Sequence, residues 1–218
     1  MLRRGAVNGA NVERFLEHAL PEAVIGGRSE RVLAYAGAFA GWKQVPMILE
    51  ALGHLPSHVR LVLMGGKGKH HAADRARLMQ LADRLGITAR VDYRGFVPPA
   101  DVPKALCEAD ILLLPLGDNP IARYFTCPLK LFEYMATGLP IIAPAYPTIT
   151  PFLADHVSAL LVDPMTPATI ARAVDELLRD PQLAAELGRN ARREAPRYSR
   201  ERRAEQLIEL ASTVKAAA

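Results

Sequence analysis

The sequence has little cysteine and no long hydrophobic run. Its two cysteines, Cys107 and Cys127, are too few for a disulfide framework, and their spacing matches no zinc or redox motif. The longest apolar run, 111–116, is far shorter than the about 18 residues that a membrane-spanning helix needs. The opening residues contain no hydrophobic block of the kind found in a signal peptide. We therefore expect a soluble, cytoplasmic protein with reduced thiols.

Motifs that would assign a chemistry directly are also missing. The chain has no Gly-x-x-x-x-Gly-Lys-Ser/Thr phosphate loop and no Gly-x-Gly-x-x-Gly after its first apolar run. It also lacks His-Glu-x-x-His, and its six histidines are scattered. The sequence thus predicts no metal centre and no bound cofactor.

The composition is that of a folded domain with a mild positive charge. Of the 218 residues, 50% are apolar and 23% are charged, which suits a chain with a substantial core. The net charge of +4 favours anionic partners in general. Much of the excess lies in arginines between 189 and 203, and Tyr198 is the only aromatic residue among them. A solvated helical face is therefore favoured there over a nucleic-acid surface.

Short apolar runs that end near glycine or proline alternate with segments of helical periodicity. Continuous apolar strands indicate a parallel sheet covered on both faces, with the helices as crossovers. We predict an α/β fold, a Rossmann-like doubly wound parallel sheet of about six strands, in a single domain over 1–218 that ends in a helix over 199–218. The predicted strands are 32–37, 59–66, 90–96, 111–115, 140–144 and 159–164, and the helices before the final one are 46–52, 73–85, 102–109, 128–136, 167–179 and 181–193.

Ligands of such sheets bind beyond the carboxyl ends of the strands. Gly37 follows the first predicted strand, and Gly66 and Lys67 follow the second. Glycines let a ligand approach the backbone, and a lysine offsets phosphate charge. A plain surface turn is an equally good interpretation of the glycine-rich loop.

Residues 124–140 carry the strongest local signal. Thr126 or Cys127 is expected near the N-cap of a helix, with Pro128 at or near its first position. Gly138 and Pro140 are expected to end that helix.

Three residues inside this helix could hold a nucleotide. The amides of Leu129 and Lys130 would be free at the helix N-terminus, where the dipole favours an anion. Glu133, one turn later, could accept two hydrogen bonds from the vicinal hydroxyls of a ribose. A solvated Glu133 paired with Lys130 is an equal alternative.

Residues 128–144, Pro-Leu-Lys-Leu-Phe-Glu-Tyr-Met-Ala-Thr-Gly-Leu-Pro-Ile-Ile-Ala-Pro, resemble the signature of glycosyltransferase family 4, also called group 1. The resemblance implies a GT-B fold, in which two Rossmann-like domains face a cleft, and a retaining, metal-independent transfer from a nucleotide-activated sugar to a glycan or glycolipid acceptor. No Asp-x-Asp occurs. Further pieces match in the same order: 8–15, 35–43, 94–97, 101–103, 109–115, 155–164 and 198–204.

The same resemblance implies that this chain is the C-terminal, donor-binding half, with 1–25 next to the hinge and the acceptor domain absent. The general base would lie in that absent domain, the isolated fragment would be inactive, and the whole protein would work in the cytoplasm, where the membrane surface is a further possible partner. A UDP- or GDP-sugar is the expected donor. The donor-binding residues would be Lys43, Phe96, Val97, Cys127, Pro128, Leu129, Lys130 and Glu133, with Gly37, Gly66, Lys67, Arg123 and Thr126 as further candidates.

Two positions depart from the family pattern. Glu133 corresponds to the second glutamate of Glu-x7-Glu, but the first falls at Phe125. The arginine that often follows the first-strand glycine falls at Ala38, and Arg123 or Lys67 is expected to compensate. These departures keep an alternative open, a non-catalytic GT-B-like interaction module with a degenerate donor site.

Overall fold

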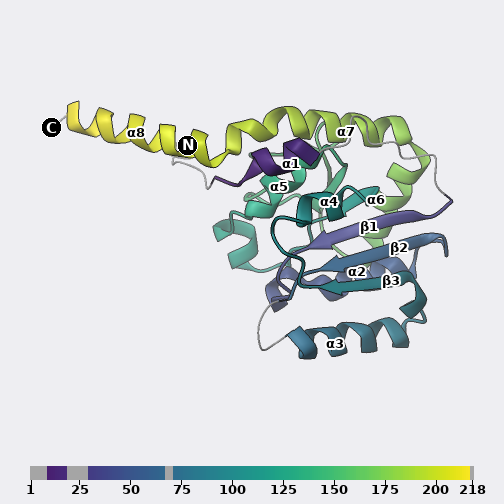
Figure 1. The fold of residues 1–218 in the computed structure, drawn as a ribbon. Helices are drawn as coiled ribbons and strands as arrows, with labels where there is room; N and C mark the ends of the chain where they lie inside the picture. The colour runs from purple at the N-terminus through teal and green to yellow at the C-terminus, as the bar shows by residue number, and fades with distance from the viewer. Residues whose placement is uncertain (1–8, 19–28, 67–70, 217–218) are drawn as a thin grey trace.

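Six parallel strands form one sheet in the order β3-β2-β1-β4-β5-β6 (Figure 1). The structure, a computed structural model, describes residues 9–18, 29–66 and 71–216. Each predicted strand is present, so the predicted sheet is confirmed. The strands are β1 (Arg31–Ala36), β2 (Val59–Met64), β3 (Val91–Gly95), β4 (Ile111–Leu113), β5 (Ile141–Pro144) and β6 (Leu160–Val162).

Helices connect the strands and close the chain (Figure 1). Helix α1 and the four short turns were not predicted. The helix expected over 102–109 is shorter, since α4 ends at Leu106. The helices are α1 (Val12–His18), α2 (Val45–Gly53), α3 (His71–Arg84), α4 (Val102–Leu106), α5 (Leu129–Thr137), α6 (Pro167–Arg179), α7 (Pro181–Glu194) and α8 (Arg200–Ala216), with the short turns η1 (Gly41–Lys43), η3 (Thr88–Arg90), η4 (Ile121–Phe125) and η5 (Ala195–Tyr198).

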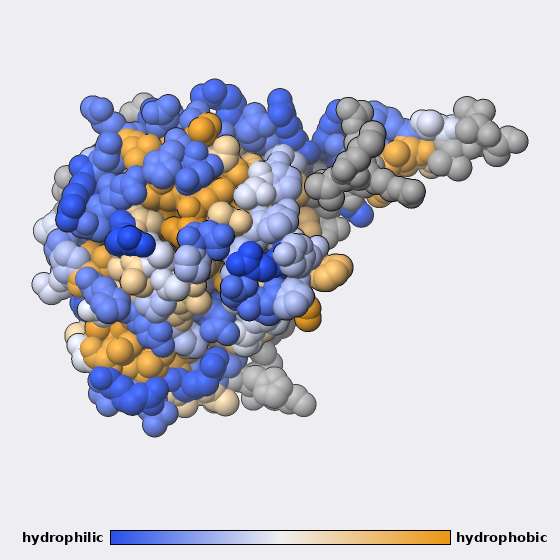
Figure 2. Space-filling view, turned by 180° about the vertical axis from the view of Figure 1, so that it is seen from behind, coloured by the Kyte–Doolittle hydropathy of each residue, from blue (hydrophilic) through white to orange (hydrophobic). Residues whose placement is uncertain are grey.

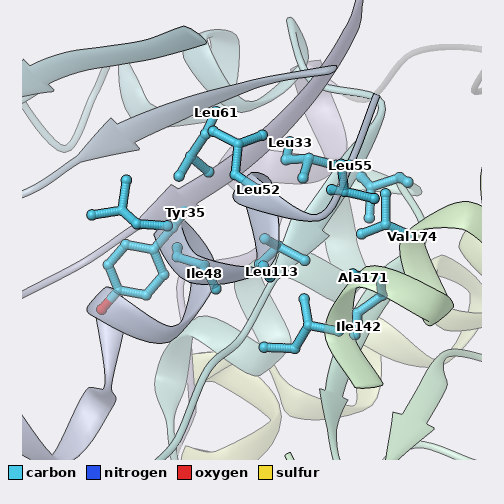
Figure 3. Packing of buried hydrophobic residues seen from close by; sticks show 14 of the residues in the cluster. Leu33, Tyr35, Ile48, Leu52, Leu55, Leu61, Leu113, Ile142, Ala171 and Val174 are labelled. Carbon is cyan, nitrogen blue, oxygen red and sulfur yellow. The ribbon is translucent and has the colours of Figure 1, made fainter. Parts of the chain in front are cut away.

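The inner strands β1, β4 and β5 are buried on both faces, which explains their almost continuous apolar residues, whereas the edge strand β3 is more polar and less buried. Successive residues of β1 point to opposite faces, so Leu33 and Tyr35 join one core while Ala34 and Ala36 join the other. Helices α2, α3 and α6 cover the first face, and α1, α4 and α5 cover the second. Figure 3 shows side chains of the first core, with strand residues packed against α2 and α6: Leu33, Leu61, Leu113 and Ile142 from the sheet, Ile48 and Leu52 from α2, and Ala171 and Val174 from α6.

The strand order sets the place for a ligand. From β1 the chain builds outward through β2 to β3 and then crosses back to add β4 on the other side of β1. The crossover directions therefore reverse at β1 and β4, which leaves a crevice beyond the carboxyl ends of these strands.

The C-terminal helix α8 extends away from the rest of the molecule (Figures 1 and 2). Leu207, Ile208 and Leu210 are exposed on it, among polar neighbours. Within the described ranges, no helix is both long enough and apolar enough to cross a membrane.

Candidate functional site

A cleft of about 480 Å³ lies at the carboxyl ends of β1, β2 and β3. Three connections supply its floor, one after each of these strands, and α5 supplies the adjoining side. The lining residues from these segments are Ala36, Gly37 and Ala38, then Met64, Gly65 and Gly66, then Phe96, Val97, Pro99 and Val102, and finally Lys130 and Glu133.

Two glycines bring the ends of β1 and β2 together on the floor of the cleft. The Gly37 amide donates to the carbonyl of Met64 at 2.7 Å, and the Gly65 amide donates to the carbonyl of Gly95 at 2.7 Å. A Cβ on Gly65 would lie 1.7 Å from the Gly37 carbonyl oxygen, and Gly65 has a φ of +149°. A larger residue would therefore collide with backbone in a conformation that side chains disfavour.

The absence of a side chain at Gly37 lets Lys130 reach across the cleft floor. A Cβ on Gly37 would lie 2.2 Å from Cε and 3.1 Å from Nζ of Lys130. The backbone on either side is fixed by two buried tyrosines. The Tyr134 hydroxyl accepts a hydrogen bond from the Ala36 amide at 2.8 Å, and the Tyr35 hydroxyl donates to the Ala38 carbonyl at 2.7 Å. The ammonium group is thus held against the end of β1.

Two lysines and one glutamate interact electrostatically at this point. Burial and, to a smaller extent, the charge of Lys130 lower the pKa of Lys43 to about 8, and Glu133 opposes both effects. Burial also lowers the pKa of Lys130, again opposed by Glu133. Two partly desolvated cations close to one carboxylate form a site that an anion would complete.

Helix α5 begins without a side-chain cap. Pro128, not Thr126 or Cys127, is the N-cap, and Leu129 is the first helical residue. Thr126 and Cys127 therefore lie near the N-cap, one or two residues before it, and the Thr126 hydroxyl donates to the Ile121 carbonyl at 2.8 Å. Among the described residues, neither the Leu129 nor the Lys130 amide has a hydrogen-bond acceptor. Both amides remain available to an anion. At the other end, Gly138 has a φ of +78° and ends the helix as predicted.

Arg123 lies on η4 and does not line the cleft. Its guanidinium binds the Asp118 carboxylate and lies 3.6 Å from that of Asp163. It also lies 4.5 Å from the centre of the Tyr146 ring. The Arg123 guanidinium, which was expected to replace the family arginine missing at Ala38, is therefore already engaged by these contacts. Phe125, at the position of the missing glutamate, is 80% exposed.

The structure brings most of the predicted residues together. Lys43 joins the cleft residues through its electrostatic interaction with Lys130 and Glu133. Pro128 and Leu129 lie at the start of α5, while Thr126 and Cys127 precede it without lining the cleft. Lys67 lies outside the described residues. The predicted residues that line the cleft are Gly37, Gly66, Phe96, Val97, Lys130 and Glu133. We call Gly37, Gly65, Lys130 and Glu133 the sheet wall.

Sequence reasoning missed a second wall, which the two ends of the chain build. Ala10 forms a β-bridge with Ser199, and the Arg200 amide donates to the Ala10 carbonyl at 3.1 Å. This pairing places Asn11, Arg14 and Arg200 on the cleft, and we call these three residues the end wall. Arg200 belongs to the basic stretch that was interpreted as a solvated face. The resemblance had marked 8–15 as a family segment, but nothing local assigned it to a cleft.

Comparisons with known proteins agree with this architecture. The family model "Glycosyl transferases group 1" matches residues 25–194. The D-inositol 3-phosphate glycosyltransferase of Corynebacterium urealyticum is 28% identical over 213 residues, which cover 93% of this chain and 49% of that protein. The chain therefore spans about half the length of the curated relatives that it matches.

Two solved structures share the fold. Sucrose-phosphate synthase from Thermosynechococcus elongatus superimposes with a TM-score of 0.81 and 25% identity, over 97% of this chain and 52% of that one. Anabaena Alr3699/HepE, solved in complex with UDP and glucose, gives a TM-score of 0.78 and 22% identity, over 94% of this chain and 55% of that one. The sheet and its helices thus match half of a GT-B glycosyltransferase.

Proposed function

Because the chain belongs to the group 1 glycosyltransferases, we propose that it is the C-terminal donor-binding half of such an enzyme and binds a UDP- or GDP-sugar in this cleft. The observation that carries the proposal is the sheet wall. Lys130 lies over Gly37 at the uncapped start of α5, and Glu133 lines the same cleft one turn later. The complex of the Anabaena protein with UDP and glucose supports a nucleotide sugar as the ligand.

The sheet wall and the groups around it each have a role in this proposal. The amides of Leu129 and Lys130, with the ammonium groups of Lys43 and Lys130, bind the diphosphate and stabilise its charge as it leaves. Glu133 accepts hydrogen bonds from the ribose hydroxyls. Phe96 and Val97 contact the base. In this scheme helix amides and lysines neutralise the diphosphate, so the transfer of a hexose is metal-independent, and the family resemblance supports retention at the anomeric carbon.

The remaining functions belong to the part of the enzyme that this chain does not cover. We place the acceptor site and the general base on a second domain across the cleft, so the 218 residues alone bind donor and transfer little sugar. We also place any contact with a membrane surface there, and a glycan or glycolipid is the proposed acceptor of a cytoplasmic enzyme. Residues 1–218 form a single domain in this proposal, with 1–25 next to the hinge.

Calorimetric titration of the chain with UDP and GDP tests the donor site. Replacing Glu133 with alanine should weaken binding by about 30-fold or more, because each hydrogen bond to a charged group contributes about 1.5–3 kcal/mol. Glu50→Ala is the matched control, since Glu50 is exposed on α2 and does not line the cleft. Its affinity should equal that of the unmodified chain. Absence of binding to either nucleotide, or unchanged binding by Glu133→Ala, would refute the proposal and favour a non-catalytic module.

A further inference from the structure

Two sides of the cleft remain beyond the diphosphate and ribose sites, and they differ in chemistry. One is apolar and consists of Phe96, Val97 and Pro99 after β3. Phe96 is 49% exposed. The other is the end wall, which consists of an amide and two guanidinium groups. A flat heterocycle between these sides would contact apolar groups on its face and polar groups at its edge.

The end wall has a fixed backbone. Val12 and Phe15 of α1 are buried in the core that α1 shares with α5, and Arg14 lies between them on the same helix. Just before α1, the Ala10 amide donates to the Tyr198 carbonyl at 2.9 Å. This bond and the bridge to Ser199 hold the start of α8 beside α1. Arg14 and Arg200 are therefore brought to the cleft by anchored segments.

The guanidinium groups of Arg14 and Arg200 are not held by a salt bridge or hydrogen bond to another described side chain, although a backbone hydrogen bond and, to a smaller extent, the charge of Arg200 lower the pKa of Glu201. Most arginines nearby are held in this way: Arg197 pairs with Glu194, and Arg202 pairs with Glu205. Within the described part of the chain, Arg14 and Arg200 form no salt bridge and no side-chain hydrogen bond. Their donors are free for a ligand in the cleft.

We propose that the end wall reads the base of the nucleotide and selects uracil, an inference that rests on the proposed donor site. The edge of uracil presents an acceptor, a donor and an acceptor, namely O4, N3–H and O2. Guanidinium groups only donate, and the Asn11 amide also offers an acceptor oxygen. Arg14, Asn11 and Arg200 can thus satisfy all three groups of the edge.

Other bases fit this set of groups less well. Guanine presents one acceptor and two donors on its pairing edge, so one arginine would face a donor. Adenine presents an amino donor and a ring nitrogen acceptor, so a guanidinium opposite its amino group finds no acceptor. The expected order of affinity is UDP, then GDP, then ADP. A phosphate-binding role for the end wall would instead affect all three nucleotides alike.

Titration of the 218-residue chain with UDP, GDP and ADP tests this inference. We expect UDP to bind at least tenfold more tightly than ADP, because one good pairing to a base edge contributes about 1–3 kcal/mol. Arg14→Met and Arg200→Met should each lower UDP affinity about fivefold or more and leave ADP affinity unchanged. Arg172→Met is the matched control, since Arg172 is exposed on α6 and outside the cleft, and it should change neither affinity.

A modified ligand tests the same contact without altering the protein. UDP methylated at N3 of uracil loses the donor that faces Asn11, so it should bind about tenfold more weakly than UDP. Equal binding of the methylated and unmodified ligands, or an equal loss of UDP and ADP affinity in the arginine variants, would overturn the inference. In either case a large effect of Glu133→Ala would leave the proposed donor site standing. If no nucleotide binds at all, the proposed function itself fails.

Discussion

The two walls of the cleft are built by different means. The sheet wall belongs to the central sheet, where glycines let the ends of neighbouring strands touch and where backbone hydrogen bonds of 2.7 Å join them. The end wall comes from segments at opposite ends of the sequence, which meet at the bridge between Ala10 and Ser199. Of its two cations, Arg200 is exposed, whereas Arg14 is half-buried, as Lys130 is.

This difference separates stability from ligand selection. A change in the sheet wall disturbs the core and the site together, because Gly37 and Gly65 are both floor of the cleft and ends of central strands. A change in the end wall leaves the sheet intact and affects the side of the cleft that α1 and α8 supply. Substitution of Gly65 in the sheet wall and of Gly9, which lies beside the end wall, can therefore distinguish the two effects.

The largest effect is expected for Gly65→Ala. Its Cβ would lie 1.7 Å from a backbone oxygen at a φ of +149°, so neither a rotamer change nor a small shift relieves the contact. Strain and overpacking should together lower the free energy of unfolding by about 3 kcal/mol or more, measured by urea denaturation. Gly53→Ala is the control, since a Cβ there meets open space. Equal midpoints for the two variants would show that the sheet wall is not rigid.

Gly9→Ala should have a smaller effect on stability and a clear effect on selection. A Cβ on Gly9 would lie 2.7 Å from the Ser199 carbonyl oxygen and 2.8 Å from Cα of Arg200, so the pairing of the two ends must open. We expect a loss of about 1–2 kcal/mol in the free energy of unfolding. The ratio of UDP to ADP affinity in calorimetry should fall toward one. If the ratio of UDP to ADP affinity is unchanged although the variant shows the expected loss of stability, the end wall does not select the base.

The sheet could be predicted from the sequence because its cause is visible locally. Burial on both faces makes strands such as β4 and β5 continuously apolar, and that pattern indicates a covered parallel sheet. The end of α5 was predicted for the same reason, since Gly138 carries its own conformational signal. The placement of Lys130 and Glu133 on the cleft followed from the position of α5 after a strand.

The end wall and the first residue of α5 could not be predicted in this way. Helix α1 has seven residues, and burial of Val12 and Phe15 against α5 stabilises it rather than any local pattern. The pairing of Ala10 with Ser199 joins residues that no sequence period connects. At α5, the Thr126 hydroxyl donates to the Ile121 carbonyl of the turn η4, and the helix begins only at Leu129. Each of these features depends on a contact with another segment of the chain, and the local sequence carries no signal for that contact.

The smallest expected effect is a pH dependence that arises at Lys43, which interacts with Lys130 and Glu133 of the sheet wall. The pKa of Lys43 is lowered to about 8, so the side chain loses its proton as the pH rises through this value, with Lys130 and Glu133 as the charged groups beside it. A bound diphosphate favours the protonated form, so UDP affinity should fall about three- to tenfold between pH 7 and pH 9.5, with proton uptake on binding.

Arginine at position 43 stays charged over this range and therefore isolates the cause. Lys43→Arg should bind UDP with nearly constant affinity from pH 7 to pH 9.5, whereas Lys104→Met, a change at an exposed lysine of α4, should keep the full dependence. Calorimetry in two buffers of different ionisation enthalpy measures the proton uptake directly. If Lys43→Arg retains the same slope, the titrating group is not Lys43, and Lys130, whose pKa burial also lowers, becomes the group to replace next.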